Sequence, residues 1–181
     1  MNLDDELNLA IKAAIKAGKF LTEHKINLNK TIFSKDKDIK LEADVKTEIL
    51  IKSILQKESS YPILGEESGS SVKSLGDIYW VIDPLDGTAN FARNIPICCV
   101  SIALILNENP ILGVIYDFNN DDMYSGSTHH KAKLNGNVIS VSSIPKKNLA
   151  IIATGLPAKT DFSESRIKKM IIDFQSWKKL E

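Results

Sequence analysis

The stretch YWVIDPLDGTANF, residues 79–91, decides how this chain is interpreted. An apolar run from Ile78 to Asp83 is rich in strand-forming residues and predicts a buried β-strand. A turn is expected where the strand ends, since Pro84 stiffens the backbone and removes an N–H that would need a partner. Asp83 and Asp86 can then point to the same side of that turn. The segment therefore predicts two carboxylates presented together at the end of a strand.

The residues around these carboxylates suit a phosphate and a cation. The Leu85 carbonyl is free to bind a metal, and Gly87 lets the backbone come close to a ligand. If a short helix begins at Thr88, the N–H groups there form an anion-binding site. Upstream, the segment GEES places Glu66 at the end of another apolar run. Carboxylates crowded into one pocket repel each other, and Mg²⁺ is the cation best matched to oxygen ligands and phosphate.

An ordinary turn is the alternative interpretation of the same residues. Aspartate, proline and glycine are each favoured in turns for local reasons, so an Asp-Pro-x-Asp-Gly string alone decides nothing. Here a strand precedes the string, a candidate anion site follows it, and Glu66 lies upstream. The agreement of these independent features favours a functional site.

Composition excludes several classes of protein. The chain has 181 residues, 43% apolar and 25% charged, with 23 basic and 23 acidic side chains. This suits a globular fold and gives no electrostatic basis for binding nucleic acid or an anionic membrane. The acidic start lacks the features of a secretory signal. The only cysteines, Cys98 and Cys99, are neighbours, so we expect two buried thiols, no disulfide, no zinc and a cytoplasmic location.

Helices are predicted at the two ends of the chain. Apolar residues at helical spacing predict helices over 4–24, 43–57 and 162–180. Residues 34–40, between the first two helices, are predicted to form an exposed loop or the tip of a hairpin. The residues expected to face the core are Leu7, Ile11, Ala14, Ile15, Gly18 and Leu21 in the first helix and Val45, Ile49, Leu50, Ile54 and Leu55 in the second.

Strands dominate the middle of the chain. Short apolar runs separated by turn residues are found at 61–65, 78–83, 98–106, 111–118, 123–126, 137–141 and 150–154. Several are joined by short polar loops, among them an Asn-Gly pair at 135–136, so we expect consecutive hairpins and a largely antiparallel sheet. An N-terminal helix pair and an antiparallel sheet predict a layered α+β domain.

Together the motifs GEES, WVIDPLDGTANF and IPICCVSIAL resemble the signature of the inositol monophosphatase family of magnesium-dependent, lithium-sensitive phosphatases. The similarity continues through GVIYD, LNG, ISVS and ATGLP. It implies a layered α/β/α sugar-phosphatase fold and a single domain over residues 1–181.

The resemblance also assigns roles to residues. The implied metal ligands for Mg²⁺ are Glu66, Asp83, the Leu85 carbonyl and Asp86. The implied catalytic residues are Glu66 and Thr88, which position and activate water, and Asp44, a carboxylate near the metal cluster. The implied substrate-binding residues are Leu85, Asp86, Gly87 and Thr88.

Departures from the family pattern limit these implications. The family continues with a further sheet and a Trp-Asp motif that binds metal, whereas Trp177 is followed here by a lysine. A threonine expected before the second helix is replaced by Leu41. We therefore expect an N-terminal portion that lacks the C-terminal layer, binds Mg²⁺ poorly and turns over slowly.

The implied function is Mg²⁺-dependent hydrolysis of a small sugar or polyol phosphate, such as inositol monophosphate, by metal-activated water. The alternatives are a 3′(2′),5′-bisphosphate nucleotidase or a fructose-1,6-bisphosphatase of the same superfamily, and a catalytically silent interaction module. The expected partners are a small phosphorylated substrate and a second copy in a homodimer, with no nucleic acid and no membrane.

Overall fold

The structure is a computed structural model that describes residues 1–35, 38–153, 160–175, 177 and 179–180. Its contacts divide the chain into two compact units, Met1–Ile139 and Ser140–Glu181. The single domain expected over 1–181 stays a prediction.

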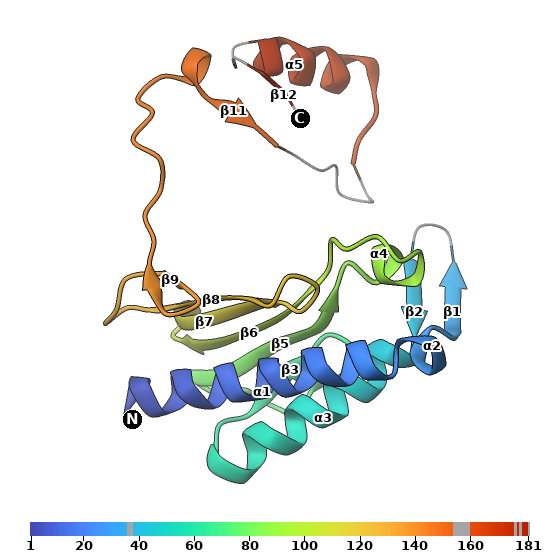
Figure 1. Cartoon of the computed structure of the whole chain (residues 1–181), viewed down its shortest axis with the longest axis vertical. Coiled ribbons are helices and arrows are strands. Elements are labelled where there is room, and N and C mark those ends of the chain that lie inside the picture. Colours follow the sequence, from blue (N-terminus) through green and yellow to red (C-terminus); the bar gives the residue numbers. More distant parts are fainter. Residues whose placement is uncertain (36–37, 154–159, 176, 178, 181) are drawn as a thin grey trace. The chain divides into compact units, whose positions relative to one another are not determined.

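The first unit is built on an eight-stranded sheet in the order β10-β9-β8-β7-β6-β5-β3-β4 (Figure 1). The strands are β3 (Ile63–Gly65), β4 (Gly69–Ser70), β5 (Ile78–Asp86), β6 (Cys99–Leu106), β7 (Asn109–Asp117), β8 (Asp122–Ser127), β9 (Lys133–Leu134) and β10 (Asn137–Val138). All neighbours pair antiparallel except β3 and β5, which run parallel. The predicted α+β class and largely antiparallel sheet are confirmed.

A separate hairpin follows the first helices. Strand β1 (Thr31–Lys35) pairs antiparallel with β2 (Asp38–Leu41), which agrees with a hairpin in this stretch. The tip itself, residues 36–37, lies outside the described residues.

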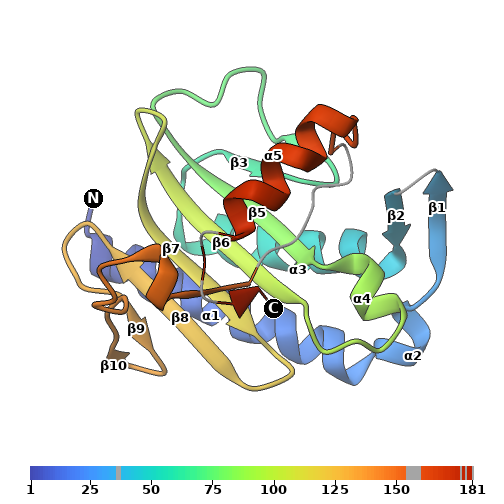
Figure 2. The same ribbon diagram turned by 90° about the horizontal axis from the view of Figure 1, so that it is seen from above.

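Two long helices cover one face of the sheet. Helix α1 (Leu3–Glu23) and helix α3 (Glu42–Glu58) lie side by side against the strands (Figures 1 and 2). The short helices are α2 (Lys25–Leu28) and α4 (Thr88–Ala92). The predicted N-terminal helix pair is confirmed. No helix among the described residues is long and apolar enough to cross a membrane.

The buried faces of these helices agree in part with the predicted ones, since Ala14, Gly18, Leu21, Ile54 and Leu55 are buried as expected. In α1 the buried side chains are mainly small, and Gly18 lies directly against the Tyr116 ring, where an added Cβ would be 2.5 Å from a ring carbon. In α3, Ile49 is 62% exposed, so its expected place in the core is wrong. The buried positions of α3 are Ala43, Asp44, Thr47, Glu48, Ile51, Ile54 and Leu55. Helix α3 thus turns acidic side chains inward, because the polar groups of the site hydrogen-bond to them.

The second unit combines short strands and one helix. It contains the 3-10 turn η1 (Lys147–Leu149), strand β11 (Ile151–Ile152), helix α5 (Glu164–Gln175) and strand β12 (Lys179–Leu180). Strands β11 and β12 pair parallel. The helix expected to reach Leu180 therefore ends earlier, since pairing with β11 draws the last residues into a strand. Most of the ATGLP segment lies outside the described residues.

Candidate active site

Two acidic residues meet where the parallel pairing of β3 with β5 ends. The register pairs Gly65 with Ile82, and the Glu66 N–H donates to the Ile82 carbonyl at 3.2 Å. Because parallel strands present their carboxyl ends at the same edge, the next residue of each strand lies beside the other. Those residues are Glu66 and Asp83, whose side chains form a hydrogen bond.

The backbone after Asp83 contains a β-bulge. Asp83 pairs with Ser101 and Asp86 with Cys99, so β5 carries one extra residue against β6. Pro84 fits this bulge because it has no N–H to leave unpaired. The sequence predicted a turn directly after Asp83, whereas β5 continues to Asp86. The Leu85 N–H donates to Asp83 Oδ1 at 3.1 Å, which holds the carboxylate at the strand end.

Burial sets the electrostatics of this pair. Burial, together with the charge and hydrogen bond of Asp83, raises the pKa of Glu66 to about 8. Burial also raises the pKa of Asp83, although hydrogen bonds from Glu66 and the Leu85 N–H oppose the shift. Two partly buried carboxyl groups in contact are costly unless a proton or a cation lies between them. Their oxygen-only donor set fits Mg²⁺.

A second polar pair joins α3 to the start of α4. The Thr88 hydroxyl lies 2.7 Å from Asp44 Oδ1 and 3.1 Å from the Leu85 carbonyl oxygen. The other carboxylate oxygen of Asp44 accepts from the Leu41 N–H at 2.8 Å. Asp44 is 1% exposed, and this burial raises its pKa despite both hydrogen bonds. The structure thus brings Asp44 and Thr88 together, 44 residues apart in sequence.

The predicted short helix is present. Helix α4 begins at Thr88, and Gly87 precedes it with a φ of 88°, a left-handed conformation that glycine adopts without strain. An added Cβ at Gly87 would lie 2.7 Å from the Ile97 carbonyl oxygen. The N–H of Phe91 donates to the Gly87 carbonyl at 3.0 Å. Both backbone strain and space therefore require glycine here.

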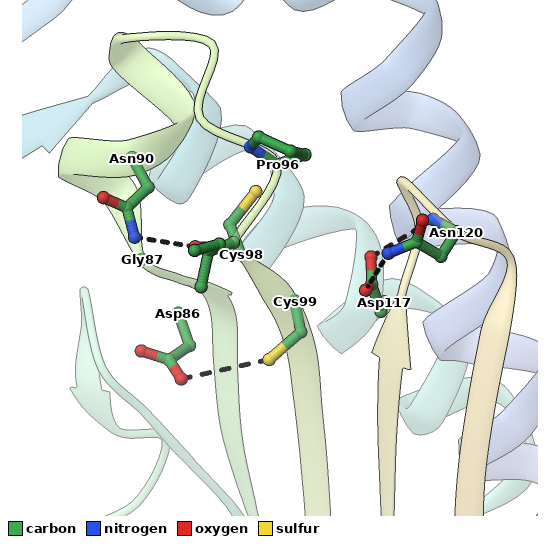
Figure 3. A pocket seen from close by; sticks show the side chains of 9 residues that line it. Asp86, Gly87, Asn90, Pro96, Cys98, Cys99, Asp117 and Asn120 are labelled. Atoms are coloured by element: carbon green, nitrogen blue, oxygen red, sulfur yellow. Dashed lines mark hydrogen bonds between the residues drawn. The ribbon is translucent and has the colours of Figure 1, made fainter. Parts of the chain in front are cut away.

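Asp86 faces a different side of the strand end. It lines a pocket of about 460 Å³, and its Oδ2 is 3.9 Å from the Cys99 thiol (Figure 3). Within the described residues, no group of three or more His, Cys, Asp or Glu side chains is arranged to hold a metal ion. The structure therefore pairs Glu66 with Asp83, and the charge of Asp86 contributes to the raised pKa of Asp83.

The two cysteines also line this pocket. Both are free thiols; Cys98 is buried as predicted, whereas Cys99 is only half-buried. Burial raises the pKa of the Cys99 thiol to about 12, with the nearby charge of Asp86 acting in the same direction.

Known proteins share this fold and these sequence features. The model of the inositol monophosphatase family matches residues 2–175. The chain belongs to the inositol monophosphatase family. It is 32% identical over 185 residues to inositol monophosphatase 2 of Solanum lycopersicum, covering 96% of this chain and 69% of that protein.

Two further relatives carry other names. The chain is 36% identical over 172 residues to Nus factor SuhB of Pasteurella multocida, covering 91% of this chain and 61% of that one. The crystal structure of extragenic suppressor protein suhB from Bartonella henselae superposes with a TM-score of 0.87 at 28% identity, covering 98% of this chain and 69% of that chain. The chain thus spans about two thirds of the length of these family members.

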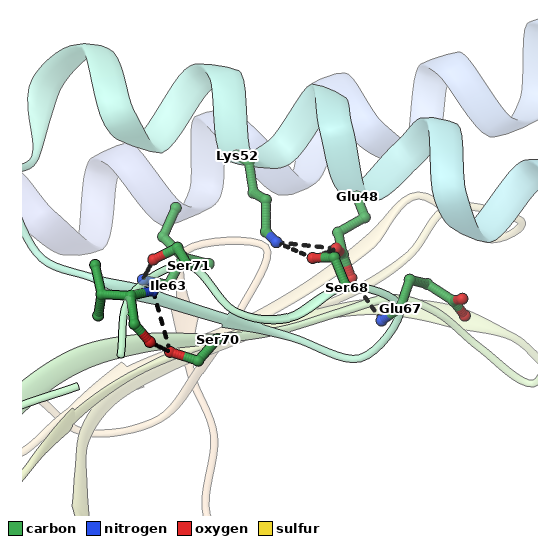
Figure 4. Close-up of polar contacts among 8 residues, drawn as sticks. Glu48, Lys52, Ile63, Glu67, Ser68, Ser70 and Ser71 are labelled. Atoms are coloured by element: carbon green, nitrogen blue, oxygen red, sulfur yellow. Dashed lines mark hydrogen bonds and ion pairs between the residues drawn. The ribbon is translucent and has the colours of Figure 1, made fainter. Parts of the chain in front are cut away.

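Glu48 is a buried acidic residue that the sequence did not lead us to expect in this member of the inositol monophosphatase family. Glu48 is 2% exposed and accepts a hydrogen bond from the Glu67 N–H at 2.7 Å, as Figure 4 shows. It also pairs with Lys52 at 3.0 Å. Its position one helical turn after Asp44 was the available signal, because residues four apart share a helix face.

Proposed function

We propose that this chain carries the Mg²⁺ site of a phosphomonoesterase that acts on a small sugar or polyol phosphate, such as inositol monophosphate. The observation that supports it best is the contact between the Glu66 and Asp83 carboxyl groups, just beyond the parallel pairing of β3 with β5. Membership of the inositol monophosphatase family supports the reaction class. Since the chain spans about two thirds of the length of its relatives, we propose slow turnover for these 181 residues alone.

Glu66, Asp83, the Leu85 carbonyl and Asp86 are the proposed ligands. Glu66 and Asp83 are already in contact, whereas Asp86 would have to turn its carboxylate away from Cys99. When bound, Mg²⁺ would neutralise phosphate charge and lower the pKa of a water molecule. These carboxylates would hold it through oxygen atoms that otherwise repel each other.

The other residues act on the reacting groups. The Thr88 hydroxyl is held by Asp44 at 2.7 Å, so it can orient a water molecule in one direction. Glu66, beside Asp83, is the proposed acceptor of the proton that this water loses. The backbone from Leu85 to Thr88 would contact the phosphate, with Gly87 permitting close approach.

The substrate class is tested by measuring phosphate release. Purified chain would be assayed with inositol monophosphate, adenosine 3′,5′-bisphosphate and fructose 1,6-bisphosphate, with Mg²⁺ or a chelator. We expect the inositol phosphate to be hydrolysed fastest, at a rate below the ~1–10³ s⁻¹ of ordinary enzymes. Asp83→Asn should abolish release, and the exposed control Asp77→Asn should leave it unchanged. Undiminished release by Asp83→Asn would overturn the assignment.

A non-catalytic binding role is a second candidate. It is favoured by the relative named Nus factor SuhB, which is 36% identical to this chain. Such a role does not need the Glu66–Asp83 pair, so Asp83→Asn would keep it while losing phosphate release. A homodimer and a cytoplasmic location remain predictions.

A further inference from the structure

The turn that carries Glu66 is fixed from helix α3. Glu48 Oε2 accepts the Glu67 N–H at 2.7 Å, and Glu48 Oε1 accepts the Ser68 hydroxyl. On the other side of Glu66, the Glu48 carboxylate occupies the space that a side chain would need, since an added Cβ at Gly65 would lie 2.5 Å from Glu48 Oε2. One buried carboxylate therefore binds the two residues that follow Glu66 (Figure 4) and packs against the residue that precedes it.

Lys52 completes this arrangement. Its ammonium lies 3.0 Å from Glu48 Oε1, and the two side chains are 17% and 3% exposed. It also donates to the Ser68 hydroxyl oxygen. A buried carboxylate needs such donors, since an unpaired buried charge is strongly destabilising. The Glu48 carboxylate thus interacts with the Glu67 N–H, the Ser68 hydroxyl and the Lys52 ammonium.

We propose that Glu48, with Lys52 as its counter-ion, is a positioning residue that sets the direction of the Glu66 carboxylate toward Asp83. The Glu66 N–H is held by the Ile82 carbonyl at 3.2 Å and the next N–H by Glu48. These two hydrogen bonds fix the backbone that carries the Glu66 side chain. The inference rests on the proposed function, because it matters for metal binding only if Glu66 is a ligand.

The effect on metal is measured by titrating Mg²⁺ alone into the 181-residue chain by calorimetry. Groups that orient metal ligands typically contribute 10–100-fold in affinity, so Glu48→Gln should raise the Mg²⁺ Kd by about that factor. The matched control is Leu55→Ala, which removes a buried side chain from the same helix. It should lower the Tm at least as much and leave the Kd unchanged. An unchanged Kd in folded Glu48→Gln, or an equal rise in Leu55→Ala, would overturn the proposal.

A second measurement needs no metal. Amide exchange at Glu67 in the metal-free chain should be about tenfold faster in Glu48→Gln, because a hydrogen bond to a charged acceptor is replaced by a neutral one. If Glu48→Gln does not fold, Ser68→Ala tests the same turn. Unchanged exchange at Glu67 contradicts the positioning role. Absence of Mg²⁺ binding to the unaltered chain contradicts the proposed function instead, while accelerated exchange still supports the role of Glu48.

Discussion

Thr88 places its hydroxyl 2.7 Å from Asp44 Oδ1, linking the start of α4 to the buried face of α3. Asp44 is almost fully buried, so this hydrogen bond satisfies an oxygen that water does not reach. The same contact fixes the hydroxyl of the residue proposed to orient the attacking water.

Removing this hydroxyl should affect both stability and activity. Thr88→Ala leaves an Asp44 oxygen without its partner, which we expect to cost about 1–3 kcal/mol of unfolding free energy. Mg²⁺-dependent phosphate release should fall about 10²-fold or more. Thr88→Ser keeps the hydroxyl and serves as the control. Urea unfolding and phosphate assays measure the two effects, and equal loss in both variants would contradict the role given to the hydroxyl.

Gly87 should tolerate no side chain. Its left-handed φ of 88° and the nearby Ile97 carbonyl together oppose a Cβ, so Gly87→Ala should lower the free energy of unfolding by about 2–4 kcal/mol. Gly76 has a φ of 68° and open space around it. Gly76→Ala should therefore cost only about 1 kcal/mol. Chemical denaturation of both variants measures the difference, and similar losses would show that space at Gly87 is unimportant.

Glu48 should stabilise the fold in a pH-dependent manner. Burial raises the pKa of Glu48. Hydrogen bonds from the Ser68 hydroxyl and the Glu67 N–H, together with the ion pair with Lys52, outweigh burial and lower the pKa below its ordinary 4.5. A carboxyl with a lowered folded-state pKa stabilises the protein fully above its unfolded value, and this contribution is lost as the pH falls through the folded value.

The difference in unfolding free energy between the unaltered chain and Glu48→Gln reports this contribution. It should be about 2 kcal/mol near pH 7 and should shrink below about pH 4.5. Urea unfolding at a series of pH values measures it. A difference that stays constant or grows in acid would contradict the assigned hydrogen bonds.

Local patterns predicted the framework of the site. The apolar runs before Glu66 and Asp83 predicted both strands, although β5 continues past Asp83 to Asp86. The Asn135-Gly136 pair forms the predicted tight turn, with φ values of 49° and 82°. These features depend on neighbouring residues along the chain, which is why sequence alone revealed them.

Features set by distant contacts were not predictable in the same way. The burial of Glu48 in place of Ile49 depends on the backbone of the Glu67 turn, 19 residues away. The bulge that carries Asp86 to the Cys99 side arises from pairing with β6. Strand β12 forms only because β11 is available as a partner. Each outcome is decided by tertiary packing, which periodicity does not encode.

The central claim is that Glu66 and Asp83 share a Mg²⁺ ion, and thermal unfolding at increasing Mg²⁺ tests it most directly. A ligand bound to the folded state stabilises it by RT ln(1 + [L]/Kd). We expect the Tm of the unaltered chain and of Asp77→Asn to rise with Mg²⁺ at constant ionic strength, and the Tm of Asp83→Asn to stay unchanged. An equal rise in Asp83→Asn, or no rise in the unaltered chain, would contradict it.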